Sequence, residues 1–234
     1  SPRGIILSQA LYPAYSELDS YAMAAACLDS AVKNIICAGG NLDHIALMDN
    51  FCWPSGTDPQ RLYQLKQACQ ACYDYAIAYG TPLISGKDSM FNDFKGYDEN
   101  NQPILLSVPP TLLISSLGVM PDVTKAVSLD VKMPDDLVYL IGLTKDELGG
   151  SEYSAYLKEL TKSTSRLAGQ VPTVDAQSAI KSYRALEKAI DQRLIASAIP
   201  VGLGGLGIAL AKMAIAGQLG LEIDLDQVPQ SGIN

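Results

Sequence analysis

Apolar residues follow two spacings along this chain, and each spacing predicts a different kind of element. Residues 20–37 and 59–79 carry apolar side chains at helical spacing, and glycine follows closely after each run, as is common at helix ends. A polar stretch at 92–102 predicts a hairpin connection. Short apolar runs bounded by turn residues predict five strands, at 4–8, 45–48, 81–85, 104–108 and 111–120. Together these elements predict long helices packed on a sheet.

The pattern changes at residues 121–126, where Pro121 ends a continuous apolar strand. We therefore predict two domains, at 1–123 and 124–234. The second domain is predicted to contain loops at 147–153 and 161–165, a buried strand at 137–143, helices at 176–197 and 208–216, and a last strand at 221–225. These elements are too few for a complete covered sheet, so we expect the second domain to be truncated.

Composition limits the classes of function. The chain has 234 residues, 48% of them apolar, and can bury one large core or two smaller ones. Its formal net charge of −8 argues against a general nucleic-acid-binding protein, because neutralising a phosphate backbone requires clustered Lys and Arg. No apolar run is long enough for a membrane span, and the first residues do not resemble a signal peptide. We therefore expect a cytoplasmic protein with no membrane partner.

The cysteines and the single histidine are predicted to be structural. The chain has five cysteines, an odd number, and most of them lie in predicted helices or strands, so we expect them to be reduced. Cys69 and Cys72 have the spacing of a metal or redox pair, but they lie inside a helical pattern with no second pair. His44 precedes the strand at 45–48 and is predicted to be a surface turn residue rather than a catalytic base.

The most informative segment is 83–90, because an apolar strand pattern there leads directly into Gly86, Lys87, Asp88 and Ser89. Glycine lets backbone N–H groups approach an anion, Lys87 supplies a positive charge, and Ser89 can bond a phosphate oxygen or bind beside a metal. The two bracketing glycines of a Walker A loop are missing, so this is no such loop. An ordinary turn after a strand is the alternative interpretation.

A second polar strand end lies at Asp49 and Asn50, directly after the strand predicted at 45–48. Ligands gather at the carboxyl ends of strands in sheets that alternate with helices. Asp49 could hold a ribose hydroxyl, an adenine amine or a hydrated metal ion. A turn is again the alternative, and the occurrence of two such strand ends favours a binding site.

The glycine cluster at 202–207 contains the spacing G-x-G-x-x-G of dinucleotide-binding proteins. We reject that interpretation, because the fingerprint should open the first strand–helix unit, whereas the residues before Gly202 are predicted to be helical. A tight entry into the helix at 208–216 explains the glycines.

Six segments are informative as an ordered set: DSAVKN at 29–34, IALMDNFCWP at 45–54, GTPLISGKDS at 80–89, PPTLLIS at 109–115, ELGGSEY at 147–153 and GGLGIALAKMA at 204–214. In these segments, and in their order along the chain, the sequence resembles the phosphoribosylformylglycinamidine synthases, within the aminoimidazole ribonucleotide synthetase-like superfamily. The resemblance implies an α/β first domain and an α+β second domain, a sandwich of sheet and helices. It also implies that the chain is most of the second of two tandem halves.

The resemblance further implies a function. Members of this family are ATP-dependent amidotransferases of purine biosynthesis, in which ATP phosphorylates the formyl amide oxygen of formylglycinamide ribonucleotide and ammonia derived from glutamine displaces the phosphate. By motif, Asp49, Gly86 and Lys87 correspond to ATP-contacting positions and Ser89 to a substrate-contacting position. No catalytic residue and no metal ligand is assigned in this chain. Magnesium is expected to be bound mostly by the missing first half, which also carries the family's catalytic histidine.

The implied partners are the first half, a glutaminase subunit and a small accessory subunit, and the exposed sheet leaves room for a homodimer of this chain. Two positions depart from the family pattern: Lys87 replaces a common Asn, and Leu203 stands where an acid is expected before the last helix. A degenerate site is therefore expected in this half. The isolated fragment is expected to be inactive, because the resemblance implies that the catalytic histidine lies in the missing half. The alternatives are a catalytically silent nucleotide-binding or assembly domain of the same enzyme, or another ATP-using enzyme of the superfamily, such as a selenophosphate or thiamine-phosphate kinase-like protein.

Overall fold

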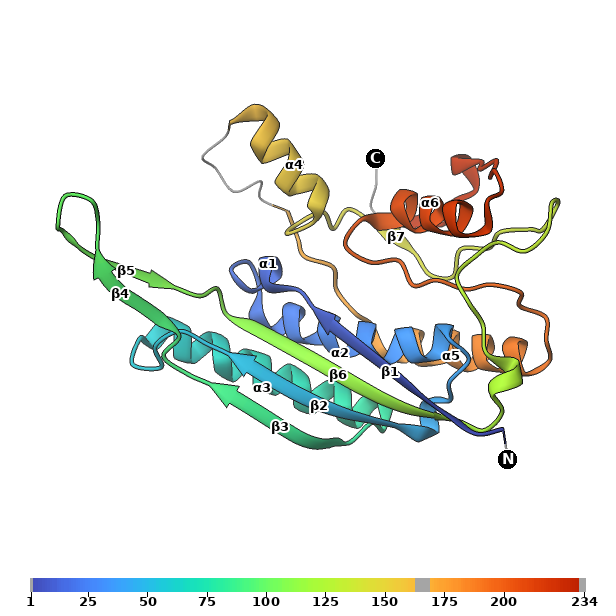
Figure 1. Ribbon diagram of the computed structural model, residues 1–234, viewed down its shortest axis with the longest axis horizontal. Coiled ribbons are helices and arrows are strands. Elements are labelled where there is room, and N and C mark those ends of the chain that lie inside the picture. The colour runs from blue at the N-terminus through green and yellow to red at the C-terminus, as the bar shows by residue number, and fades with distance from the viewer. Residues whose placement is uncertain (1, 163–168, 232–234) are drawn as a thin grey trace.

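The structure, a computed structural model, describes residues 2–162 and 169–231 (Figure 1). The first part of the chain forms β1 (Gly4–Leu11), α1 (Pro13–Ser16), α2 (Ser20–Cys37), β2 (Ile45–Cys52), α3 (Pro59–Tyr79), β3 (Leu83–Ser89), β4 (Asp93–Tyr97), β5 (Pro103–Ser107) and β6 (Thr111–Met120). The second part contains β7 (Thr144–Lys145), α4 (Glu152–Thr161), α5 (Ala176–Asp191), α6 (Gly205–Gly217) and β8 (Gln230–Ser231). The chain is thus a mixed α/β protein.

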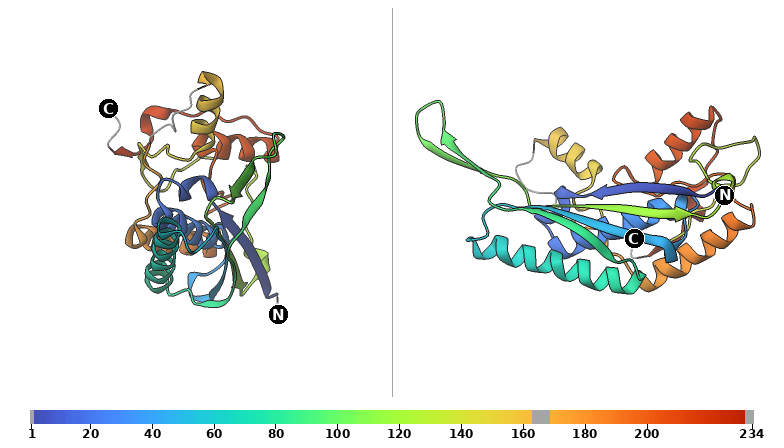
Figure 2. Two further views of the ribbon diagram at one scale, coloured as in Figure 1. Left: turned by 90° about the vertical axis from the view of Figure 1, so that its left-hand side faces the viewer. Right: turned by 60° about the horizontal axis from the view of Figure 1, so that its bottom comes forward.

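A four-stranded sheet with the order β1-β6-β2-β3 organises the first part. β2 pairs in parallel with β3, and β6 pairs antiparallel with both β1 and β2. Helices α2 and α3 cover one face of this sheet, and the opposite face is uncovered in the part of the chain that the structure describes (Figure 2). Ile5 and Leu7 of β1 point to the uncovered side and are 69% and 70% exposed. We call this side the open face.

Helix α2 lies at the centre of the core. Fifteen of its eighteen residues are buried, because it packs against the sheet as well as against α3 and α5. Its run of alanines combines high helix propensity with a small side chain, which lets its neighbours approach closely. Asp19 caps the N-terminus by accepting a hydrogen bond from the Ala22 amide at 2.9 Å. The sheet adds Leu47, Leu112 and Ile114 to this core, α3 adds Ala68, and the residue after β2 is Trp53; all five are fully buried.

Helix α5 follows the predicted domain boundary in sequence, yet it packs on α2 and α3. The buried carboxylate of Asp29 on α2 accepts a hydrogen bond from the Tyr79 hydroxyl at 2.7 Å and another from the Tyr183 hydroxyl of α5. Lys33 completes the cluster with an ion pair to Asp29 at 3.4 Å. The domain boundary at 123/124 stays a prediction. The structure shows that α5, which follows this boundary in sequence, packs on the core of the first part.

The predicted elements of the first part are present, although several are longer than expected. Strands predicted at 45–48 and 81–85 extend to Cys52 and Ser89, because they pair in parallel over that whole length. The sequence pattern predicted that the polar residues follow the strand ends. Because the backbone pairing continues past these predicted ends, the polar residues are instead part of the strands. The stretch predicted as a loop at 92–102 does form a hairpin, but it contains β4, which pairs with β5.

Several predictions for the second part are wrong. Residues 137–143 form no strand, and Leu137 and Tyr139 are 77% and 78% exposed, because no described strand lies beside them to pair with. Residues 221–225 likewise form no strand, and the helix predicted at 176–197 ends at Asp191. The loop predicted at 147–153 contains the start of α4, which Ser151 caps. Of the loop predicted at 161–165, Thr161 and Lys162 close α4, and 163–165 lie outside the described residues.

Removing the Tyr183 hydroxyl tests whether α5 is fastened through Asp29. We expect Tyr183→Phe to lower the free energy of unfolding by about 1–3 kcal/mol, the usual value of a buried hydrogen bond to a charged group. Tyr73→Phe, on the exposed side of α3, is the matched control, since Tyr73 is 64% exposed and should change stability by under ~0.5 kcal/mol. Urea denaturation followed by circular dichroism measures both. Equal effects of the two substitutions would contradict the role given to Asp29.

Candidate functional site

The four predicted contact residues lie on two adjacent parallel strands. In the register of β2 with β3, Asp49 is paired with Gly86, Asn50 with Lys87, and Cys52 with Ser89. The polar segment 86–89, predicted to contact phosphate just after a strand, is therefore extended backbone within β3. Since β3 pairs on only one side, its outer backbone N–H and C=O groups form a free edge in the described structure.

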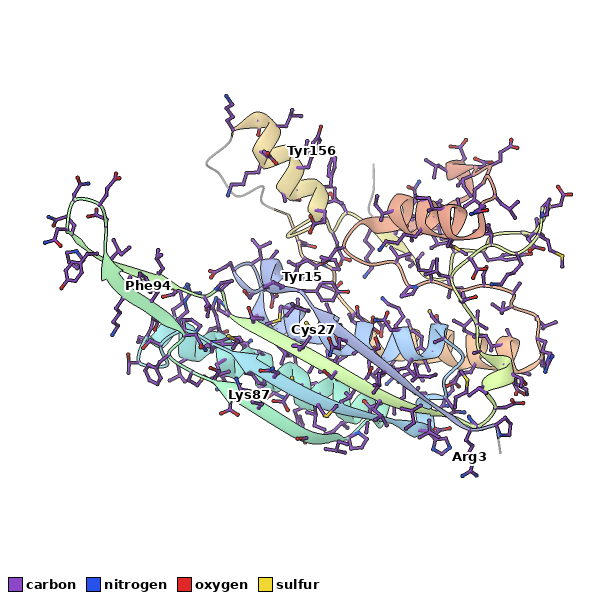
Figure 3. All side chains as sticks on the ribbon, viewed as in Figure 1. Arg3, Tyr15, Cys27, Lys87, Phe94 and Tyr156 are labelled. Carbon is purple, nitrogen blue, oxygen red and sulfur yellow. The ribbon has the colours of Figure 1, made fainter. Side chains whose placement is uncertain are left out.

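Alternation along the strands separates the side chains into two sets. Leu47 and Phe51 are buried against the helices, so Asp49, which lies between them, shares their side of the sheet. Asn50 and its partner Lys87 point to the open face. Figure 3 labels Lys87 on β3, where it is exposed. The structure thus brings the predicted residues to one edge of the sheet, but it places Asp49 and Lys87 on opposite sides of that edge.

Gly86 has a specific steric role beside Asp49. A Cβ atom built on Gly86 would lie 2.4 Å from Oδ1 of Asp49, far inside van der Waals contact. Any other residue would have to displace this carboxylate. The absence of a side chain at Gly86 therefore leaves the Asp49 carboxylate accessible from the free edge of β3.

The Asp49 carboxylate lies in an electrostatically unfavourable position. Partial burial raises its pKa above the ordinary value, and the negative charge of Asp88 raises that pKa further. Asp49 and Asp88 in turn raise the pKa of Cys69 on α3, after burial, which makes the largest contribution. Within the described chain, no ion pair or hydrogen bond from another residue's side chain compensates Asp49. A carboxylate whose ionised form is destabilised by burial and by a neighbouring negative charge is typical of a functional position.

Lys87 and Ser89 differ in how far they are free to bind a ligand. The Lys87 side chain makes no ion pair or hydrogen bond to any residue that the structure describes. The Ser89 hydroxyl donates to Oδ1 of Asn92 at 3.0 Å, so its proton is used within the protein and its lone pairs remain for a ligand donor. Asn50, which the sequence analysis did not assign to a ligand, adds an amide beside Lys87. Only the strand register reveals that proximity.

The cysteines and His44 take no part in this site. All five cysteines are free thiols, as predicted, and burial raises the pKa of Cys27 to about 12. His44 is exposed at the end of a short 3₁₀ helix (Leu42–His44), which confirms the predicted surface turn. Among residues 2–162 and 169–231, no group of three or more His, Cys, Asp or Glu side chains could hold a metal ion.

The glycine cluster lines a separate cavity of about 380 Å³ between the end of β1 and the start of α6. Residues 192–201, directly before the cluster, form no strand, so the structure agrees with the rejection of a dinucleotide fingerprint. Gly204 is required by close packing, because a Cβ there would lie 2.6 Å from Cβ of Ile208, and Gly205 has a φ of +68°. Leu203 and Lys212 line the cavity without any carboxylate. Since Mg²⁺ prefers carboxylate oxygens, this lining does not fit a magnesium site.

Curated relatives match nearly the whole chain. A protein of Deinococcus radiodurans, named phosphoribosylformylglycinamidine synthase subunit PurL, is 35% identical over 231 residues, which are 97% of this chain and 29% of the relative. The protein of the same name from Methanocaldococcus jannaschii is 31% identical over 234 residues, 99% of this chain and 30% of the relative. The chain thus spans about three tenths of these relatives.

In the described residues, no helix is long and apolar enough to cross a membrane.

Solved structures share the fold. T. maritima PurL complexed with FGAR superposes with a TM-score of 0.69 at 17% identity, covering 97% of this chain and 34% of that one. E. coli HypE, a hydrogenase maturation protein, gives a TM-score of 0.61 at 12% identity, covering 97% and 62%. At these identities the likeness shows the fold alone.

Two family models account for most of the sequence. The N-terminal domain of AIR synthase related protein matches residues 3–108, and the C-terminal domain of the same family matches residues 133–232. The two matches occur in the order in which their names place them, and the structural neighbours have the same fold. The chain therefore belongs to the family of AIR synthase related proteins.

Proposed function

We propose that this chain is part of a phosphoribosylformylglycinamidine synthase, the ATP-dependent amidotransferase that converts formylglycinamide ribonucleotide to its amidine with ammonia from glutamine. The proposal is supported by relatives named PurL that match 97–99% of this chain. The observation that carries it is Lys87, a cation at the β3 edge whose side chain has no ion pair among the described residues, in a protein with a net charge of −8. Such a cation is suited to an anionic nucleotide or substrate.

In this proposal ATP lies along the free edge of β3. Because Gly86 has no side chain, the nucleotide can approach Asp49, which accepts a hydrogen bond from a ribose hydroxyl or the adenine amine. Lys87 neutralises part of the phosphate charge on the other side of the edge, away from Asp49 and Asp88, which would repel phosphate. Ser89 contacts the substrate through its free lone pairs. These residues position charge and supply neither a nucleophile nor a general base.

Magnesium, the glutaminase, the accessory subunit and the other half of the synthetase would complete the reaction. The open face beside Lys87 carries Asn50 and serine hydroxyls but no carboxylate, so this chain's residues there do not fit a Mg²⁺ site. The other half of the synthetase would therefore bind the metal ion that accompanies the nucleotide. It would also contain the catalytic histidine. The two-domain division at 123/124 and the cytoplasmic location stay predictions.

A catalytically silent nucleotide-binding or assembly domain is the second candidate. One observation favours it: the cavity before α6 has Leu203 where an acid is expected, and none of its lining residues is a carboxylate. The two candidates differ in whether substitutions at the β3 edge change turnover in an assembled enzyme or only nucleotide affinity.

Replacing Lys87 tests the phosphate contact. We expect Lys87→Ala to weaken ATP binding about 5–10-fold, since one charge-assisted contact at an exposed site is worth about 1 kcal/mol. Lys95→Ala is the matched control, because Lys95 is an exposed lysine on β4 away from this edge and removes the same charge. Calorimetric titration with ATP measures both variants. An equal loss in the two would mean that net charge alone, and no contact with Lys87, determines binding.

Replacing Asp49 separates stability from binding. Its pKa is raised in the folded state, so the unfolded chain ionises first as the pH rises, and stability falls above the ordinary pKa near 3.8. We therefore expect Asp49→Asn to raise the melting temperature at neutral pH, with no gain below about pH 4. The same variant should bind ATP more weakly. A stabilised variant with unchanged ATP affinity would remove Asp49 from the site.

A further inference from the structure

Helix α3 carries a groove on its outer surface, on the same side of the sheet as the Asp49 carboxylate. The groove has a volume of about 470 Å³, and its lining comes from the first half of the helix: Pro59, Leu62, Tyr63, Leu65, Lys66 and Cys69. Leu62 and Tyr63 are 53% and 62% exposed. Of the described residues that line the groove, Lys66 alone is charged. A cavity of this size with a mostly apolar lining is typical of a small-molecule site.

The groove is continuous with the edge of β3. Cys69 is the last residue of the lining, and its thiol lies near two carboxylates: burial raises the pKa of Cys69, and the negative charges of Asp49 and Asp88 raise it further. Asp49 borders Gly86, whose missing side chain leaves the strand edge open. Lys87 follows on the opposite side of that edge. One path therefore leads from Lys87 across the strand edge, past Asp49, to the groove on α3.

The charges along this path determine the direction in which a nucleotide can lie. Asp88 is two residues after Gly86, so its side chain shares the helix side of the strand with Asp49. Both carboxylates would repel phosphate on that side, whereas Lys87 attracts phosphate on the other side. A purine base is uncharged and has two apolar faces, so the helix side, with its apolar groove, suits the base. The ribose, which joins the base to the phosphates, then lies beside Asp49.

We propose that the groove on α3 binds the adenine ring of ATP and that Asp49 accepts a hydrogen bond from the ribose. This inference rests on the proposed function, since it extends the ATP site at the β3 edge onto the helix layer. Tyr63 stacks on one face of the ring, and the Lys66 cation lies against its π-system. Leu62 and Leu65 supply apolar contacts. Tyr63 and Lys66 thereby become base-binding residues of the site.

Replacing Tyr63 tests the contact with the base. We expect Tyr63→Ala to weaken ATP binding about 5–10-fold, because stacking of the base on the aromatic ring is lost. The melting temperature should not change, since Tyr63 is exposed and outside the core. Tyr73→Ala is the matched control: Tyr73 is 64% exposed on the same helix and does not line the groove, so this variant should bind ATP as the unmodified chain does. Calorimetric titration of the full chain with ATP measures both variants.

The same titrations separate this inference from the proposed function. ATP binding that is weakened by Lys87→Ala but unchanged by Tyr63→Ala would overturn the base site and leave the proposed function standing. Equal weakening by Tyr63→Ala and Tyr73→Ala would also overturn the base site, because the loss would not be specific to the groove. An unmodified chain that binds no ATP would overturn both.

Photolabelling locates the base without any substitution. 2-Azido-ATP carries its reactive group on the adenine ring, so illumination should attach the label within residues 59–69, which line the groove. An excess of ATP should prevent this labelling. Mass spectrometry of the digested chain identifies the labelled segment. Labelling of the glycine cluster at 202–207 or of another segment, with none at 59–69, would place the base elsewhere and overturn the inference.

Discussion

The parallel pairing of β2 with β3 is the constraint on which the rest of the site depends. Side chains alternate along each strand, so a slip of one residue would exchange the two sides of the sheet. In the observed register Asp49 lies beside Gly86, whose missing side chain leaves room for the carboxylate, and Asn50 lies beside Lys87. The register thereby places the Asp49 carboxylate and the Lys87 cation on the two sides of one strand edge, and neither pairs with another side chain among the described residues. In the proposed site, this separation puts the sugar or base of a nucleotide beside the carboxylate and its phosphates beside the cation.

The helix layer holds this edge in position. Helix α2 is buried almost throughout, and the carboxylate of Asp29 joins it to α3 through Tyr79 and to α5 through Tyr183. The sequence places α5 beyond a change of pattern at 121–126, yet the structure packs it on the first part of the chain. The two parts are therefore connected through buried polar contacts.

The sequence predicted the secondary structure of the first part of the chain better than that of the second part. Helical spacing predicted α2 and α3 correctly, since both bury an apolar face against the sheet. The strand lengths were underestimated because pairing of the backbone, which pattern cannot show, extends β2 and β3 through polar residues such as Asp49 and Lys87. Residues 137–143 are a continuous apolar run, as in a buried strand, but have no neighbour to pair with among the described residues. Asn50 was missed as a companion of Lys87 because their proximity follows from register and not from spacing along the chain.

Hydrogen–deuterium exchange with and without ATP tests the central claim most directly, because it reports where the nucleotide lies without any substitution. The account predicts slower exchange in β3 (Leu83–Ser89), whose outer amides are free, and no change in the glycine cluster at 202–207 before α6. Protection confined to 202–207, with β3 exchanging as before, would contradict it and would place the nucleotide in the cavity beside Leu203.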